Sequence, residues 1–124
     1  MKQQNYQKGK RGEDIAESHL IRNGFQIVEK NFHNRFGEID IIATKGSTLH
    51  FVEVKLKIGE DFGTPEEMIN KRKLFQIRST AELFILKNRK IAGIFPHHQI
   101  DAVCIVLDEN KEVERLNHYE SIES

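Results

Sequence analysis

The pattern of apolar and polar positions is clearest over residues 37–57, GEIDIIATKGSTLHFVEVKLK. Ile, Val and Phe on both sides of a turn-forming Gly46-Ser47 pair predict two antiparallel strands joined by a tight turn. Four charged residues nevertheless interrupt these apolar runs, namely Glu38, Asp40, Glu53 and Lys55. Because charged groups are costly to bury in a strand, these positions call for a reason other than folding.

A two-residue turn also fixes the register, because the numbers of facing residues then have a constant sum. Asp40 is expected to face Glu53, and Glu38 to face Lys55, with all four side chains on one surface of the hairpin. The other surface is predicted to be core and carries Ile39, Ile41, Ala43, Val52, Val54 and Leu56. Two facing carboxylates repel each other, and a bound divalent cation would convert that repulsion into coordination.

A helix is predicted before the hairpin, since apolar residues recur at helical spacing over residues 11–23 and Gly24 supplies a stop. Glu13 shares the inward face of this helix with Ala16 and Leu20. An acid in a first turn also favours the helix dipole, which is the alternative reason for Glu13.

The 124 residues are expected to form a single domain, because this length suffices for one hydrophobic core. Gly9 and Gly12 are predicted to be flexible entry points to the first helix. Residues 1–10 and 120–124 are expected to be mobile ends.

After the hairpin, the pattern predicts a loop, a long helix and two final strands. Thr64 and Asn70 give the helix two candidate caps, and the helix is expected to run to about Asn88. The other strands are predicted at residues 25–32, 100–107 and 112–119. We therefore expect an α/β domain with a mixed central sheet built on the antiparallel hairpin and flanked by helices.

The charge distribution is more informative than the net charge. Lys and Arg total 19, as do Asp and Glu, so the formal net charge at pH 7 is zero. Basic residues nevertheless gather in residues 1–12 and 70–90, whereas residues 108–123 are mostly acidic. A basic side could hold the phosphates of a nucleic acid, although ordinary solvated helix faces would give the same pattern.

Other residues point away from alternative functions. Cys104 lies in an apolar run and is expected to be a buried hydrophobe without a redox role. The sequence shows no export signal and no apolar run of membrane-spanning length, which predicts a cytoplasmic protein without a membrane partner. Asp101 is expected to lie at the edge of a buried face and to pair with a basic side chain. Gly-x-Ser-x-Gly, P-loop and dinucleotide motifs are absent from the sequence.

The residue types of the hairpin suit a divalent metal site. Asp40 and Glu53 offer hard oxygen ligands, and Lys55 adds a cation, which together favour Mg²⁺ or Mn²⁺. Such a metal could activate a water for attack on a phosphodiester, with Lys55 orienting the water or stabilising the transition state. Glu13 would be a further ligand, and Glu38 is expected to support the site. A charged hairpin face with cross-strand ion pairs is the alternative.

Six segments carry a resemblance to a known family, in order and at matching distances: KGKRGEDIAESHL, NGFQIVEKNF, GEIDIIA, FVEVKLK, FGTPEEMINKRK and IDAVCIV. Over residues 8–119 the chain resembles the YraN-like family of uncharacterised bacterial proteins. That family is similar to the PD-(D/E)XK nucleases, which have a restriction-endonuclease-like fold, and in particular to archaeal Holliday junction resolvases. The resemblance implies catalytic roles for Glu13, Asp40, Glu53 and Lys55, with the metal on the three acids.

The expected function is a metal-dependent nuclease acting on DNA, with branched or structured DNA as a candidate substrate. Phosphate contacts are predicted for Lys10, Arg11, Lys57, Lys71, Arg72 and Lys73. A junction-cutting enzyme would need a two-fold homodimer to present two sites. The alternatives are a non-catalytic nucleic-acid-binding module that retains the nuclease fold and a protein-interaction role. The chain departs from the family pattern at Lys57 and Gln99, where arginine is usual.

Overall fold

The computed structural model describes the backbone of residues 2–123 and the side chains of residues 8–123. Its elements are α1 (Lys2–Arg22), β1 (Gln26–Asn34), β2 (Gly37–Lys45), β3 (Thr48–Ile58), the 3₁₀ turn η1 (Glu66–Met68), α2 (Lys71–Lys87), α3 (Arg89–Ile94), β4 (His97–Leu107) and β5 (Val113–Tyr119). The prediction of mobile ends stays a prediction, and residues 1 and 124 lie outside the described residues.

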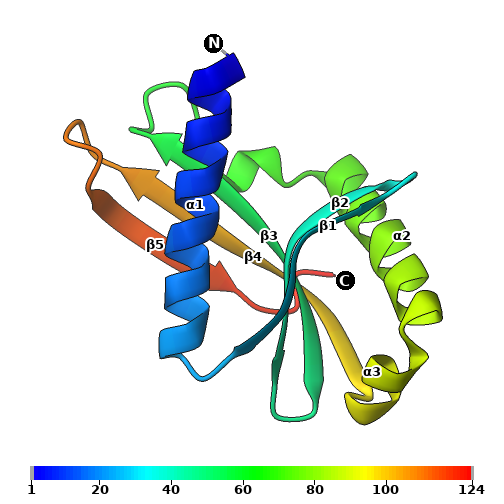
Figure 1. The fold of residues 1–124 in the computed structure, drawn as a ribbon. Helices are drawn as coiled ribbons and strands as arrows, with labels where there is room; N and C mark the ends of the chain where they lie inside the picture. Colours follow the sequence, from blue (N-terminus) through cyan, green and yellow to red (C-terminus); the bar gives the residue numbers. More distant parts are fainter. Residues whose placement is uncertain (1, 124) are drawn as a thin grey trace.

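The five strands form one twisted sheet in the order β1-β2-β3-β4-β5 (Figure 1). All neighbouring strands are antiparallel except β3 and β4, which are parallel. A parallel pair needs a crossover connection, and here η1, α2 and α3 provide it. The expected α/β class, with a mixed sheet flanked by helices, is confirmed.

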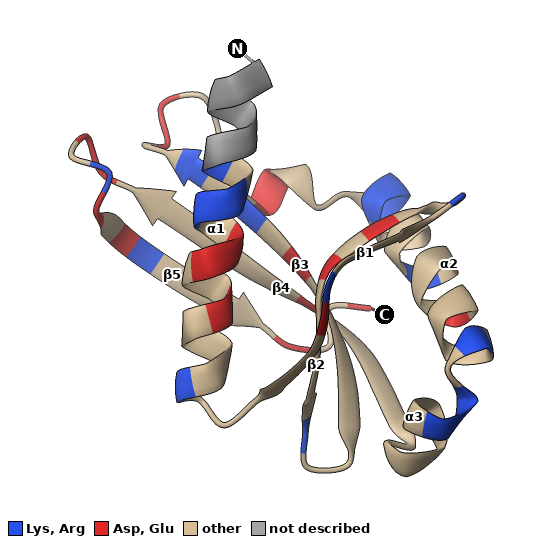
Figure 2. Cartoon of the chain, in the orientation of Figure 1, with Lys and Arg blue, Asp and Glu red and all other residues tan. Residues whose placement is uncertain are grey.

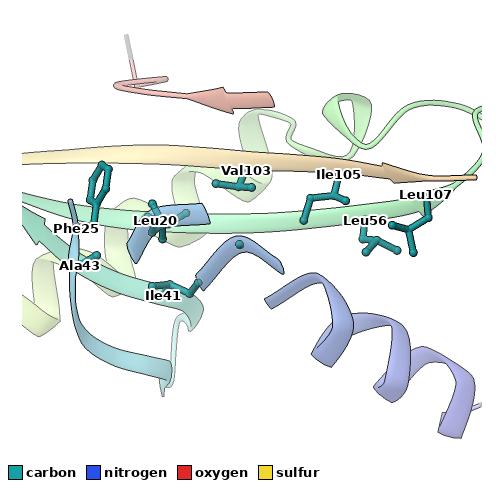
Figure 3. Close-up of a cluster of buried hydrophobic side chains, with 10 residues drawn as sticks. Leu20, Phe25, Ile41, Ala43, Leu56, Val103, Ile105 and Leu107 are labelled. Atoms are coloured by element: carbon teal, nitrogen blue, oxygen red, sulfur yellow. The ribbon is translucent and has the colours of Figure 1, made fainter. Parts of the chain in front are cut away.

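Helix α1 covers one face of the sheet and closes a core between itself and strands β2 to β4 (Figure 3). Ala16 and Leu20 of α1 are fully buried there, as predicted for its inward face. Ile41, Ala43, Val52, Leu56, Val103 and Ile105 provide most of the sheet side of this core.

Helix α2 covers the opposite face, where Ile77, Ala81 and Phe84 pack on the sheet. Ile39 belongs to this second core, so its predicted place beside Ile41 on the first core was wrong. The twist of the β1–β2 hairpin turns its far end towards α2 and so brings Ile39 into the second core (Figure 1). Phe32 of β1 accordingly contacts Phe84 of α2, with ring centroids 5.1 Å apart.

Helix α1 begins earlier than predicted, and both Gly9 and Gly12 lie inside it. Gly12 is buried, and a Cβ at this position would lie 3.3 Å from Leu56 Cβ. The glycine therefore serves close packing of α1 on β3, not flexibility at the helix entry.

Both predicted caps of the second helical region are used. Thr64 Oγ1 accepts from the backbone N–H of Glu67 at the start of η1, and Asn70 Oδ1 accepts from the backbone N–H of Lys73 at the start of α2. Two separate helical segments replace one helix with an uncertain start.

Two expectations about side chains and membranes can be compared with the structure. Cys104 is completely buried, and burial raises the pKa of its thiol to about 12, which fits a core residue. Within the described part of the chain, no helix has both the length and the apolar character needed to cross a membrane.

Candidate metal centre at the fork of the sheet

The sheet divides between β2 and β3, and we call this division the fork. Pairing follows the predicted register from Lys45 opposite Thr48 to Ile41 opposite Val52, and then stops. Beyond that point β2 remains paired with β1, whereas β3 remains paired with β4, so the two halves separate (Figure 1). The first residue of each strand past the last pair is a carboxylate, Asp40 or Glu53.

The predicted cross-strand pairing of Glu38 with Lys55 is wrong. Glu38 instead lies opposite His33 of β1 and is exposed. The register argument assumed that the hairpin stays paired along its whole length, and the fork ends that pairing. Glu38 therefore lies at the rim of the site.

The carboxylate of Asp40 takes over a hydrogen bond that the backbone of β2 would make in an unbroken ladder. The backbone N–H of Val54 donates to Asp40 Oδ2 over 2.8 Å. Asp40 is only 8% exposed, so this bond also fixes the direction of a nearly buried side chain.

Asp40 and Glu53 act as a carboxyl pair. Burial raises the pKa of Asp40 to about 8, and hydrogen bonding to Glu53 and the charge of Glu53 act in the same direction. The N–H of Val54 and the charge of Lys55 oppose this shift. Two carboxylates that share a buried site cannot both ionise freely, so the pair retains a proton near neutral pH when no cation is bound.

Glu53 is 2% exposed, and its carboxylate contacts one basic side chain of helix α2, that of Lys73. Lys73 Nζ is 3.0 Å from Glu53 Oε2, which is an ion-pair distance. Oε2 is nevertheless a buried oxygen without a partner of hydrogen-bond geometry among the described side chains. Burial alone would lower the pKa of Lys73, but the charge of Glu53 raises that pKa above its ordinary value.

Glu13 approaches the same acids from helix α1, on the inward face that its spacing predicted. Burial and the charge of Asp40 raise the pKa of Glu13, while Asn31 and Lys30 act against that rise. Glu13 is partly buried, and the effect of Asp40 on its pKa places the two carboxyl groups in the same region. Because α1 spans Lys2–Arg22, Glu13 lies in the middle of the helix and not in its first turn, so the alternative explanation by the helix dipole was wrong.

Charge effects on pKa thus link Glu13, Asp40, Glu53 and Lys55 at the fork, and Lys73 joins them through its ion pair with Glu53. Lys55 is partly buried, and its charge lowers the pKa of Asp40. These side chains come from α1, β2, β3 and α2, so both layers of helices contribute to one site.

The remaining basic candidates surround the fork less closely. Lys10 and Arg11 are exposed on α1, where Arg11 Nη2 donates to the carbonyl oxygen of Lys111. Lys71 and Arg72 are exposed at the start of α2. Lys57 is partly buried on β3. Figure 2 shows basic residues along α2 and α3 and acidic residues at the β4–β5 turn and in the loop after β3.

Sequence reasoning missed a second polar cluster, which is centred on Asp101. This residue is fully buried and accepts from His50 Nδ1 at 2.7 Å and His118 Nε2 at 3.0 Å. Gln99 Nε2 and the backbone N–H of Ser121 donate to its other oxygen. Asp101 therefore has basic partners, as expected, but it is fully buried and not at the edge of a buried face. The two histidine partners are distant in sequence, and only the parity of Asp101 with buried residues signalled its inward direction.

This second cluster includes a group that could hold a metal ion. Ligand atoms of His50, Asp101 and Glu120 all lie within 4.8 Å of one another. Burial would raise the pKa of Asp101, but hydrogen bonds from His118, His50 and Gln99 hold it well below its ordinary value. Because four donors already satisfy the two oxygens of Asp101, this carboxylate is stable without an ion.

The fork is a second place whose residue types could hold a divalent ion. Its donors are hard carboxylate oxygens, the preferred ligands of Mg²⁺ and Mn²⁺. Glu53 Oε2 is buried with no partner of hydrogen-bond geometry among residues 8–123, although Lys73 Nζ lies 3.0 Å away, and burial and Glu53 both oppose ionisation of Asp40. A cation between the two carboxylates would remove both difficulties.

The fold and the fork together define an α/β protein with a buried carboxylate site where a mixed sheet divides. The chain belongs to the UPF0102 family, described as an uncharacterised protein family, whose pattern residues 12–105 match. This confirms the resemblance at the level of the family. The family description names no function.

Relatives of similar length support this membership. A UPF0102 protein of Nitratiruptor sp. is 45% identical over 111 residues, which cover 90% of this chain and 93% of the relative. A UPF0102 protein of Syntrophomonas wolfei is 35% identical over 107 residues, covering 86% of this chain and 89% of the relative. A UPF0102 protein of Persephonella marina is 48% identical over 86 residues, which cover 69% of this chain and 73% of the relative.

Proposed function

We propose that this protein is a metal-dependent nuclease of the PD-(D/E)XK type that hydrolyses phosphodiester bonds in DNA. The observation that carries the proposal is the Asp40–Glu53 pair, in which two nearly buried carboxyl groups lie side by side at the fork. Folding gains nothing from such a pair, because both burial and mutual repulsion oppose its ionisation. A site for a divalent cation explains it.

Each residue of the cluster has a defined task in this proposal. Asp40 and Glu53 would hold Mg²⁺ or Mn²⁺, with Glu13 as a further ligand, direct or through water. A bound ion supplies a water of lowered pKa and neutralises charge on the phosphate. Asp40 is oriented for binding because the N–H of Val54 already holds its Oδ2.

Lys55 would act on the reacting groups. Its ammonium group can orient the attacking water or stabilise the charge that develops on the phosphate. Lys55 is two residues beyond Glu53 on β3, and its charge acts on Asp40. Exposed basic residues near the fork, Lys71 and Arg72 among them, would hold the flanking phosphates.

Cleavage assays test the proposal directly. The protein is incubated with linear duplex, single-stranded, flap and four-way DNA in Mg²⁺ or Mn²⁺, beside Asp40→Ala and Lys55→Ala. We expect wild-type cleavage with either metal, none in chelator, and a rate at least about 100-fold lower in each variant. Cleavage that persists in both variants would show a contaminating nuclease and overturn the assignment.

The DNA panel also identifies the substrate and separates the alternatives. Preferred cutting of four-way DNA would require a two-fold dimer, which sedimentation with the junction would detect. Salt-sensitive binding without cleavage in either metal would instead favour a binding module that retains the fold. If neither binding nor metal affinity appears, a protein-interaction role remains.

A further inference from the structure

We propose that Lys73 is an internal counter-cation of the fork, whose ammonium group neutralises Glu53 in the metal-free protein and is displaced by the divalent ion towards the substrate phosphate. This inference rests on the proposed function, because it assumes that Glu53 binds a metal. It assigns Lys73 a regulatory task on metal binding in addition to the predicted phosphate contact.

The contact between Lys73 and Glu53 joins a partly exposed side chain to a buried one. Lys73 Nζ lies 3.0 Å from Glu53 Oε2, and the side chains are 24% and 2% exposed. An ionised Glu53 without a cation would be strongly unfavourable at this depth. Lys73 therefore stabilises the ionised form of Glu53 when no metal is bound.

The position of Lys73 in its helix strengthens this reading. Its backbone N–H is the one that Asn70 caps, so Lys73 lies in the first turn of α2. That turn carries no acidic residue, and positive charge at a helix N-terminus opposes the helix dipole. Lys71 and Arg72 are exposed to solvent, which screens this cost, whereas Lys73 is directed into the fork. Its direction is therefore explained by Glu53 and not by α2.

Glu53 Oε2 is also the oxygen that lacks hydrogen-bond geometry with any described side chain. The ammonium group is near enough to neutralise this oxygen but does not saturate it. A doubly charged ion with hard oxygen ligands would bind the same oxygen more strongly. An ion that binds Oε2 would compete with the ammonium group for this oxygen, and we expect it to displace Lys73 Nζ.

A lysine suits such a displacement. Its ammonium group sits on a flexible four-carbon stem and can move without a change of backbone. Because α2 is capped and packed through Ile77 and Phe84, the movement is confined to the side chain. A phosphate bound beside the metal is the anion that would receive the released charge.

Metal titration without DNA tests the inference. Mn²⁺ binding is measured calorimetrically at constant pH for wild type, Lys73→Met, Lys73→Gln and the control Lys71→Met. Removal of the competing ammonium group should tighten Mn²⁺ binding about tenfold in both Lys73 variants. Lys71→Met removes an equal charge from the exposed position two residues earlier and should change affinity less than about twofold. Equal effects at the two positions, or unchanged or weaker binding in the Lys73 variants, would overturn the inference.

Glu53→Gln separates this failure from failure of the proposed function. If wild type binds Mn²⁺ and Glu53→Gln does not, the metal site stands whatever the Lys73 variants do. If neither the wild type nor any variant binds Mn²⁺, both the proposed metal site and the proposed role of Lys73 are wrong. At saturating Mn²⁺ the Lys73 variants should cut DNA at least about tenfold more slowly, and cleavage at the wild-type rate would contradict the release of Lys73 to phosphate.

Discussion

Asp40 is a nearly buried acid whose ionisation opposes folding. A raised folded-state pKa lowers the free energy of unfolding as pH rises, here from about 4, where the unfolded chain titrates, to about 8. Asp40→Asn can still accept from Val54 but carries no charge. In chelator at pH 8 we expect this variant to be more stable than wild type by about 2 kcal/mol, with the difference vanishing near pH 4.

Urea unfolding across this pH range measures that difference. Glu38→Gln is the matched control, because Glu38 is an exposed acid two residues away and should change stability by less than about 0.5 kcal/mol. A destabilised Asp40→Asn protein at pH 8 would show that the carboxylate contributes to folding. Saturating Mn²⁺ should reverse the order, because it stabilises only the wild type.

Asp101 behaves in the opposite way, since every one of its contacts favours the charged form. In Asp101→Asn one carboxylate oxygen becomes an NH₂ group, which is itself a donor. That NH₂ group would face two other donors, either the two histidines or Gln99 and Ser121. We expect a loss of about 2 to 4 kcal/mol in urea unfolding at pH 7. Asp108→Asn is the control, because Asp108 accepts only backbone N–H groups at an exposed turn and an Asn oxygen can do the same.

The two carboxyl clusters also show how far the sequence predicts individual residues. Alternation along a strand correctly gave the inward direction of Asp101, and helical spacing gave that of Glu13. The contacts of His50 with Asp101 and of Lys73 with Glu53 depend on how separate elements pack. No local periodicity contains that information, so these partners could not be identified from the sequence.

At the level of elements, the close approach of α1 to β3 depends on the absence of a side chain at Gly12. Gly9 lies one turn earlier in the same helix, and a Cβ there would meet nothing within 4 Å. Gly9→Ala should therefore stabilise the protein by up to about 1 kcal/mol through helix propensity. Gly12→Val should destabilise it by about 1 to 3 kcal/mol, because Leu56 and Val54 already occupy the space.

Thermal unfolding of the two glycine variants, with Gly12→Ala as an intermediate step, checks this argument. Gly12→Ala gains helix propensity but must move Leu56 by a few tenths of an ångström, so it should fall between the other two. A stabilising Gly12→Val substitution would mean that α1 does not lie as close to β3 as described.

The positions of the helices and strands could be predicted from the sequence better than the fork between β2 and β3. The Gly46-Ser47 turn fixed the register of β2 and β3 near the turn, because a two-residue loop allows few pairings. The fork lies at the other end of the hairpin, where β2 stays paired with β1 and Phe32 of β1 packs on Phe84 of α2. Such long-range forces are absent from the alternation pattern, which therefore placed Ile39 in the wrong core.

For the whole molecule, the uneven charge predicts how DNA would be oriented. Basic residues follow α2 and α3, while the β4–β5 turn is acidic (Figure 2). We expect Lys71→Gln combined with Arg72→Gln to weaken DNA binding and to reduce the slope of log affinity against log salt by about 2. Lys111→Gln, at the acidic turn, should leave the slope unchanged, as measured by fluorescence anisotropy without divalent metal. An equal change of slope for the Lys71/Arg72 double variant and for Lys111→Gln would contradict a complex in which DNA lies along α2 and α3.

The hydrogen bond between Val54 and Asp40 makes one backbone amide a spectroscopic reporter of the candidate site. Its proton points at a carboxylate and not at a carbonyl, so its chemical shift should follow the charge of that carboxylate. In an isotope-labelled protein, the Val54 resonance would move as the pair loses its proton near pH 8 and again when a cation binds. NMR could therefore follow occupancy of the fork without a substrate.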